Sequence, residues 1–394
     1  MSTCLFFTSN PQRHEFRRST AMVVGSLISF ALALCGCEKV PTFQELTGQE
    51  SKPVAAANPV PPDQPAAVTP PVQTPVVAAP ARIEDPQEVL SAFMKIPHHE
   101  RSDADLIRLA KLPAASDSIT EMDCASAKGV TDAGIQHLAK FPNIEHLSLA
   151  GTRVTQVGMS AVSSLTRLKS LDLRGCVLNH EMLIEMVKAE HIERLVLSQT
   201  TGGEDYLETL SSLPDLRVLD ISLRGISDNN LTSLANCLKL EELYLQRDPI
   251  DGSGLQFLHS KKGPPLRILN VSSTRFGDKG MPYLKGLDTL EELIADDCGI
   301  TDQALLQHLK GLSHLRKLSL GLNKISDIGT QALVSIKSLE DVSFHGCTNV
   351  GDKTLGYLKA HKNLRQLNVM GCRISPAALQ TFKKLLPDCE VTSN

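Results

Sequence analysis

The sequence predicts an α/β solenoid of about eleven repeats, a horseshoe with a parallel sheet on its concave side and helices on its convex side. A short run with apolar residues at positions 1, 4 and 6 recurs eleven times, as in Leu168, Leu171 and Leu173. The runs begin at residues 119, 144, 168, 192, 216, 240, 266, 290, 315, 339 and 364, so neighbouring runs are 24 to 26 residues apart. A segment of helical apolar spacing follows each run, and a period this regular indicates stacked units.

The first half of each repeat predicts a short strand with one buried face, because its apolar residues alternate, as in Leu147 and Leu149. Position 9 usually carries a small polar or sulfur side chain, which can bond to the turning backbone. The residues at this position are Ala127, Thr152, Cys176, Thr200, Arg224, Asp248, Thr274, Cys298, Asn323, Cys347 and Cys372. Ala127 and Arg224 are the exceptions.

The second half of each repeat predicts a helix that begins after a capping residue. In Thr131-Asp132 and Ser326-Asp327 the hydroxyl can cap the first turn, and the carboxylate favours the positive end of the helix. In the last repeat, Ser375-Pro376 places a proline at the first helical position. Apolar residues then recur at intervals of three or four, as in Leu355 and Leu358.

This pattern, LxxLxLxx(C/T/N)x(I/V)(T/S)DxG(L/M)xxL, closely resembles leucine-rich repeats of the cysteine-containing type, the solenoid of ribonuclease-inhibitor-like proteins. The resemblance covers residues 119–391 and implies a binding protein, although the family serves many unrelated binding roles. Three repeats depart from the pattern. Repeat four has Thr200-Thr-Gly-Gly-Glu at its helix start, repeat six has two extra residues near Lys261, and repeat one has Met122 and Cys124 in strand positions.

Residues 1–36 resemble a bacterial export signal. A basic region containing Arg17 and Arg18 precedes the apolar stretch 21–34, which is short for a membrane span. The following Leu34-Cys35-Gly36-Cys37 resembles a lipobox, and this resemblance implies cleavage before Cys37 and lipidation of that residue. The alternatives are an ordinary signal peptide and an uncleaved anchor with incidental cysteines.

Residues 37–83 predict a disordered tether rich in proline and alanine, because residues 41–80 hold ten prolines and one aromatic residue, Phe43. Forty residues of extended polyproline-like chain can reach on the order of 120 Å. Residues 84–118 predict an N-terminal helical cap, with one helix after Asp85 and another after Ser102. The solenoid then spans 119–394 and ends in a C-terminal cap that contains a helix around Phe382 and a strand at 389–391.

Composition excludes several function classes. The chain has a net charge of −4 and no basic stripe, so we expect no nucleic-acid partner. Aromatic residues make up 4% of the chain and tryptophan is missing, which argues against a sugar-stacking groove. No phosphate-binding, metalloprotease or serine-hydrolase motif occurs, so we expect neither an enzyme nor a cofactor. The ten cysteines suggest a disulfide framework, but Cys176, Cys298, Cys347 and Cys372 all occupy position 9, where the repeat explains them.

Two histidine motifs do not predict a catalytic or metal site. His98-His99-Glu100 is expected in a solvated loop between the cap helices, because adjacent side chains point apart. His345 is close in sequence to Cys347, but position 7 faces the concave surface while position 9 faces inward. A catalytic thiol–imidazole pair is therefore not expected.

The candidate binding site lies on the concave face, where strand positions 3, 5 and 7 point away from the core. Its middle gathers charges of both signs around Tyr244, the one Phe, Tyr or Trp predicted on this face. The candidate residues are Arg174, Arg194, Asp220, Glu242, Tyr244, Gln246 and Arg247.

The leading hypothesis from the sequence is a lipoprotein held in the bacterial cell envelope by Cys37, which binds an unidentified protein or peptide through its concave face. One alternative is an intracellular adaptor similar to F-box-linked leucine-rich-repeat proteins. Another is a structural envelope component that assembles with itself.

Overall fold

The computed structural model describes residues 84–201, 206–259 and 263–393, all within one compact unit, Ala79–Asn394. The predicted signal peptide (1–36), the lipidation residue Cys37 and the predicted tether (37–83) lie outside the described residues.

The repeat predicted from the sequence is confirmed as a stack of parallel strands in one sheet, ordered as in the chain from β1 to β12. Each of the first eleven strands begins two residues after the start of an apolar run, and β12 is the strand predicted near the C-terminus. They are β1 (Glu121–Asp123), β2 (His146–Ser148), β3 (Ser170–Asp172), β4 (Arg194–Val196), β5 (Val218–Asp220), β6 (Glu242–Tyr244), β7 (Ile268–Asn270), β8 (Glu292–Ile294), β9 (Lys317–Ser319), β10 (Asp341–Ser343), β11 (Gln366–Asn368) and β12 (Glu390–Thr392).

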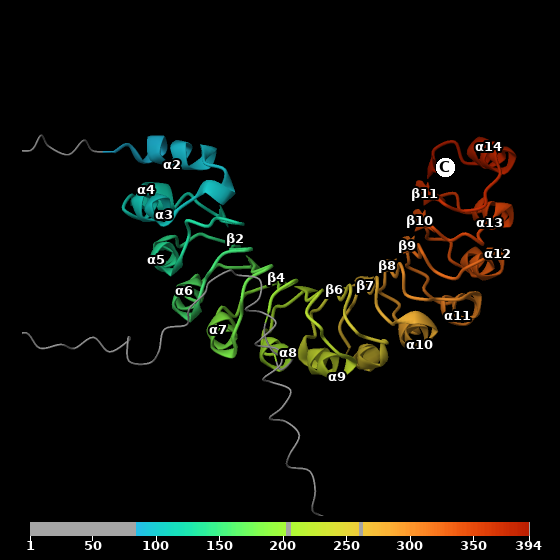
Figure 1. Cartoon of the computed structure of the whole chain (residues 1–394), viewed down its shortest axis with the longest axis horizontal. Coiled ribbons are helices and arrows are strands. Elements are labelled where there is room, and N and C mark those ends of the chain that lie inside the picture. Colours follow the sequence, from blue (N-terminus) through green and yellow to red (C-terminus); the bar gives the residue numbers. More distant parts are fainter. Residues whose placement is uncertain (1–83, 202–205, 260–262, 394) are drawn as a thin grey trace, which may run out of the picture. The chain divides into compact units, whose positions relative to one another are not determined.

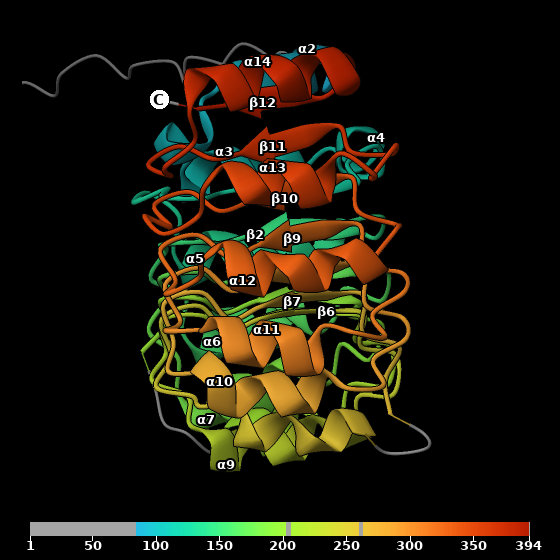
Figure 2. The same ribbon diagram turned by 90° about the vertical axis from the view of Figure 1, so that its right-hand side faces the viewer.

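The helices lie on the outer side of this stack, and the strands line its inner, concave side (Figures 1 and 2). Several repeats replace part or all of the predicted α-helix with a 3₁₀ turn, labelled η. The helices of the repeats are α5 (Asp132–Ile135), η4 (Gln136–Lys140), α6 (Gln156–Val162), α7 (His180–Met186), α8 (Tyr206–Leu210), α9 (Asp228–Leu231), η5 (Thr232–Asn236), η6 (Ser253–His259), α10 (Gly277–Gly280), η7 (Met281–Leu284), α11 (Asp302–His308), α12 (Asp327–Thr330), η8 (Gln331–Ser335), α13 (Asp352–Leu358) and α14 (Pro376–Leu385). None of the helices in the described part of the chain is both long and apolar enough to cross a membrane.

The first repeat is preceded by α2 (Pro86–Lys95), η3 (His98–Glu100), α3 (Asp103–Ala110) and α4 (Pro113–Ser116). Both helices predicted in this segment are present, and the capping residues have the expected roles. The Asp85 side chain accepts a hydrogen bond from the amide of Gln87, and Ser102 forms a capping box with Asp105. Phe93, Leu106 and other apolar side chains of these helices join the same buried core as the repeats.

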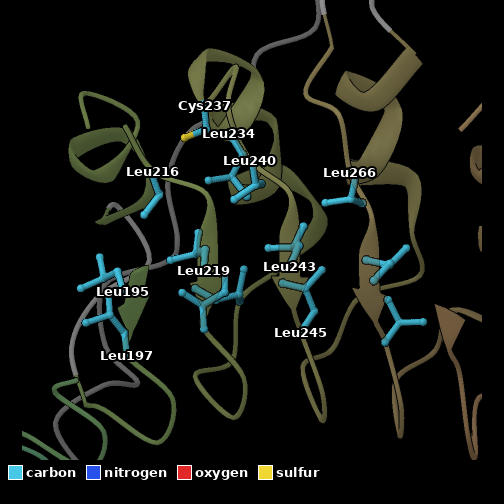
Figure 3. Close-up of a cluster of buried hydrophobic side chains, with 14 of the residues drawn as sticks. Leu195, Leu197, Leu216, Leu219, Leu234, Cys237, Leu240, Leu243, Leu245 and Leu266 are labelled. Carbon is cyan, nitrogen blue, oxygen red and sulfur yellow. The ribbon is translucent and has the colours of Figure 1, made fainter. Parts of the chain in front are cut away.

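The core is a continuous row of leucines between the sheet and the helices. In the middle of the stack, Leu195, Leu219 and Leu243 from successive strands are completely buried and lie one beside the next (Figure 3). Each such side chain contributes about 1.5–3 kcal/mol of hydrophobic free energy relative to an exposed one. Because each repeat buries its leucines only against its neighbours, the stack stabilises every unit cooperatively.

Position 9 forms the predicted inner ladder of backbone contacts. The thiols of Cys176, Cys298 and Cys347 lie 3.2, 3.1 and 3.2 Å from the carbonyl oxygens of Leu149, Val271 and Leu320, respectively. Threonines at this position donate instead to a carbonyl within their own repeat, as Thr152 does to Leu149. All seven cysteines in the described residues are free thiols, and the ladder accounts for the four at position 9, Cys176, Cys298, Cys347 and Cys372.

The aspartate at the helix start has a role that the sequence analysis did not identify. Asp302 accepts hydrogen bonds from the amide and hydroxyl of Ser326 in the next repeat, at 2.7 and 2.5 Å. The same link to the next unit recurs for Asp103, Asp132, Asp228, Asp278, Asp327 and Asp352. The expectation that this aspartate serves its own helix is therefore incomplete, because the carboxylate chiefly joins consecutive repeats.

A second ladder runs along position 2, at the edge where the strands begin. From Glu145 to Arg365 this position alternates between acidic and basic residues in ten successive repeats: Glu145, Lys169, Glu193, Arg217, Glu241, Arg267, Glu291, Arg316, Glu340 and Arg365. Arg267 binds Glu291 through two hydrogen bonds of 2.8 and 3.0 Å, and Arg316 binds Glu340 in the same way. This edge is therefore charge-balanced, and its ion pairs favour the observed register of neighbouring strands.

Candidate functional site

The concave face of the sheet is made by the first and third residue of each strand, because the middle residue points into the core. Most of these outer residues are exposed or half-buried, as predicted. Val196 and Asn270 are exceptions, with 3% and 8% of their surface exposed. These two side chains therefore contribute little accessible surface to the concave face, although their strand positions predicted that they would.

Arg194, Glu242 and Tyr244 form the centre of the candidate site. The Tyr244 hydroxyl donates a hydrogen bond of 2.9 Å to Glu242 Oε2 on the same strand, β6. The guanidinium of Arg194, two strands away on β4, lies 4.0 Å from the same carboxylate oxygen. Burial raises the pKa of Tyr244 well above its ordinary value, and the bond to Glu242 adds to this effect. The ring is therefore a fixed, neutral hydrogen-bond donor at neutral pH.

Asp220 and Gln246 lie next to this centre and are joined by a residue that the sequence analysis missed. The Ser222 hydroxyl lies 2.7 Å from Asp220 Oδ1 and also contacts the side-chain oxygen of Gln246. Ser222 is buried at position 7 of its repeat. In the sequence, only this position could have indicated that it lies beside Asp220 and Gln246. The three side chains hold one another in place, which leaves little rotamer entropy to lose when a ligand binds.

The structure separates the two remaining candidates from the centre. Arg174 pairs with Asp172 of its own repeat at 3.2 Å. Arg247 is exposed at position 8 and has a left-handed backbone with φ of 61°. Position 8 has positive φ in every one of the eleven repeats, even where it is Leu223 or Leu322. Arg247 therefore projects from the loop after β6 and not from the sheet.

The structure gives His345 and Cys347 different hydrogen-bond partners. Within the described residues, no group of three His, Cys, Asp or Glu side chains could hold a metal ion. The imidazole of His345 lies 3.2 Å from the Ser343 hydroxyl, whereas the Cys347 thiol points inward to a backbone carbonyl. Burial also raises the pKa of Cys347 and takes that of Cys372 to about 11, so both thiols stay protonated at neutral pH.

Comparisons with known proteins give the fold. A family model described as "Leucine Rich repeat" matches residues 264–284 and 311–334. The structure is similar to that of the yeast Rad7–Elc1 complex, with a TM-score of 0.50 and 19% identity over 78% of this chain and 87% of that chain. A search of curated protein sequences found no significant match.

Two bacterial structures show a similar arrangement. An internalin of Listeria monocytogenes, InlF, aligns with a TM-score of 0.49 and 19% identity over 78% of this chain and 93% of that chain. A leucine-rich-repeat protein of Leptospira interrogans aligns with a TM-score of 0.49 and 17% identity over 72% of this chain and 74% of that chain.

Proposed function

We propose that this chain, whose fold is a leucine-rich-repeat solenoid, binds a protein or peptide on its concave sheet with Arg194, Glu242 and Tyr244 at the centre. The supporting observation is the half-buried Tyr244, which is hydrogen-bonded to Glu242. An aromatic ring and an arginine held in place are the side chains that most often anchor a protein interface. The helices of the repeats lie on the other side of the sheet and leave this face open (Figure 1).

The dimensions of the face favour a macromolecular ligand. Twelve strands at about 4.8 Å spacing give a sheet about 53 Å across. Such a surface can hold a folded domain or an extended peptide, and both would contact several repeats at once.

Combined replacement of Arg194 and Glu242 by Gln and of Tyr244 by Ser is expected to abolish capture of the ligand. The three changes remove the central ring and its charged neighbours but leave the leucine core intact. Crosslinking to native envelope followed by quantitative mass spectrometry of the captured proteins measures the effect. The matched control changes Glu181 and Lys353 to Gln and Tyr357 to Ser on the helices α7 and α13. Equal capture by both variants and the unchanged protein would contradict the proposed centre.

We further propose that the solenoid is exported and held at a membrane by a lipid on Cys37. Mass spectrometry of the mature N-terminus should find a chain that starts at lipidated Cys37, and Cys37→Ser should release the protein into the soluble fraction. Recovery of full-length protein in the cytosol with Met1 intact would instead favour an intracellular adaptor. The distribution of an unrelated envelope lipoprotein in the same fractions serves as the control.

A further inference from the structure

The negative charge of the chain is concentrated on the concave face. The outer residues of the twelve strands include eight carboxylates and two basic side chains, Arg194 and Lys317, a net charge of −6. The whole chain has a net charge of −4, and the edge ladder at position 2 carries five acidic and five basic residues. The acidity therefore belongs to this face and is not a general property of the surface.

Three of these carboxylates are evenly spaced along the same row. Glu242, Glu292 and Asp341 are the first residues of β6, β8 and β10, so they recur at every second strand. At about 4.8 Å per strand, the row from Glu242 to Asp341 is about 19 Å long, with a carboxylate about every 9.6 Å. A polyproline-II chain rises about 3.1 Å per residue and repeats its face every third residue, which is about 9.3 Å. An extended β-strand instead repeats its face about every 6.8 Å and does not match.

The surface beside Glu242 and Glu292 is shaped as a groove, and Asp341 lies one strand beyond Lys317 at its end. A cavity of about 290 Å³ is lined by Glu242, Ile268, Glu292 and Lys317 and by four residues of the edge ladder, Arg267, Glu291, Arg316 and Glu340. The two arginines are each bound by a ladder glutamate through two hydrogen bonds, so the ladder adds no net charge to the groove. Ile268, half-buried between Glu242 and Glu292 in the strand register, gives the groove an apolar floor.

The carboxylates in this row differ in how well they are already paired. Glu292 lies 3.4 Å from the Lys317 ammonium, and Glu242 interacts with Arg194 and Tyr244. Asp341 makes no ion pair among the described residues. Burial raises the pKa of its carboxyl above the ordinary value despite the attraction of Lys317. Lys317, its register partner on β9, pairs with Glu292, so a cation placed at Asp341 would stabilise a half-buried charge that the protein compensates only in part.

We propose that this groove binds a cationic segment in polyproline-II conformation, with a lysine or arginine at every third residue opposite Glu242, Glu292 and Asp341. The inference rests on the proposed function, because it takes the concave face to be the binding surface, and it adds the chemical class of the partner. Proline-rich segments suit this site because their conformation is already ordered before binding.

The test measures the binding of the full chain to peptides of about 15 residues by fluorescence anisotropy. A peptide of Lys-Pro-Pro repeats should bind, whereas Glu-Pro-Pro repeats should not. A peptide of the same composition with all its lysines in one block should bind at least about tenfold more weakly, because only one or two lysines can reach a carboxylate. Glu292→Gln with Asp341→Asn should also weaken the Lys-Pro-Pro complex about tenfold and reduce its dependence on salt.

The control variant changes Glu181 and Glu208 to Gln on the convex helices α7 and α8, which gives the same change of net charge away from the groove. The proposal would be overturned if this control weakened the Lys-Pro-Pro complex as much as Glu292→Gln with Asp341→Asn. It would also be overturned if the block peptide bound as tightly as Lys-Pro-Pro repeats, because the attraction would then be non-specific. Thermal unfolding of both variants confirms that they fold. If capture of the native ligand depends on Tyr244 but Lys-Pro-Pro repeats do not bind, this inference fails and the proposed function stands. If peptide binding depends on Glu292 and Asp341 while native capture ignores Tyr244, the proposed centre fails instead.

Discussion

Replacing Gly329 by alanine is expected to lower the free energy of unfolding by about 2–3 kcal/mol, although alanine is the better helix former. A Cβ atom at Gly329 would lie 2.4 Å from Asp302 Oδ1 and 2.8 Å from Asp302 Cα. Asp302 would have to move, and its hydrogen bonds to the amide and hydroxyl of Ser326 would be lost. Chemical denaturation followed by circular dichroism measures the change.

Gly356 provides the matched control, because it also lies inside a repeat helix, α13. Apart from its chain neighbours and the backbone of its own helix, no atom of the described residues lies within 4 Å of the position of its added Cβ. Gly356→Ala is therefore expected to stabilise the protein by about 0.5–1 kcal/mol, since it only restricts the unfolded chain. If Gly329→Ala were as stabilising as Gly356→Ala, the link between Asp302 and the next repeat would have no energetic role. Asp302→Ala should lower the free energy of unfolding less in the Gly329→Ala variant than in the unchanged protein, because Gly329→Ala has already broken the link.

The strands and the inward ladder could be predicted because they depend on residues within a single repeat. The apolar alternation of Leu243 and Leu245 determines which face of β6 is buried, and the size and polarity of Cys347 suit a backbone contact at position 9. The aspartate links were missed because Asp302 and Ser326 are a full repeat apart. A signal was available in Gly329, since a glycine inside a helix indicates that another group approaches closely.

The charge ladder was also visible in the sequence, but only when position 2 is compared from one repeat to the next. Within a single repeat, Arg267 resembles any exposed arginine; its alternation with Glu241 and Glu291 is what predicts the ion pairs.

The sequence predicted which residues lie on the concave face better than it predicted which of them contact one another. Strand alternation places Arg194, Glu242 and Tyr244 on one face, and the structure brings them together. Side-chain rotamers decide the rest, so the pairing of Arg174 with Asp172 could not be derived from spacing. The left-handed backbone at Arg247 was equally hidden, because the loop geometry common to all repeats imposes it on a residue that does not favour it.

Asp248→Asn is expected to raise the free energy of unfolding by about 2 kcal/mol at pH 8. Asp248 is 2% exposed. Its Oδ1 accepts hydrogen bonds from the amides of Arg224, Gly225 and Ile226, at 3.0, 2.8 and 3.2 Å. Its Oδ2 is buried without a partner in the described residues. An asparagine keeps the acceptor, supplies a donor in place of Oδ2 and removes a buried charge. The attraction between Asp248 and Arg224 is lost, but it is the weakest of the effects on this carboxyl.

The gain from Asp248→Asn should depend on pH in a defined window. Burial raises the pKa of Asp248 from 3.8 to about 6 in the folded protein, so the folded state holds this proton more tightly than the unfolded state. The contribution of Asp248 to stability is therefore present below pH 4 and is lost as the pH rises through about 6. The difference between Asp248→Asn and the unchanged protein should be small near pH 4 and reach its full value above pH 7. Denaturation curves across this range measure it, and a difference that does not change with pH would contradict the raised pKa.

Asn323 provides the reciprocal test, because it occupies position 9 three repeats further along. Its Oδ1 accepts from the amides of Cys298 and Ile300, and its Nδ2 donates to the carbonyl oxygens of Ala295 and Leu320 at 2.7 and 3.0 Å. Asn323→Asp removes those donors and buries a carboxylate against carbonyl oxygens. We expect a loss of about 3 kcal/mol at pH 8 and a smaller loss near pH 4, where the new carboxyl is protonated. Opposite signs for Asp248→Asn and Asn323→Asp would establish that an amide suits both of these sites better than a carboxylate. A loss of stability in both variants would mean that each site is adapted to its own residue.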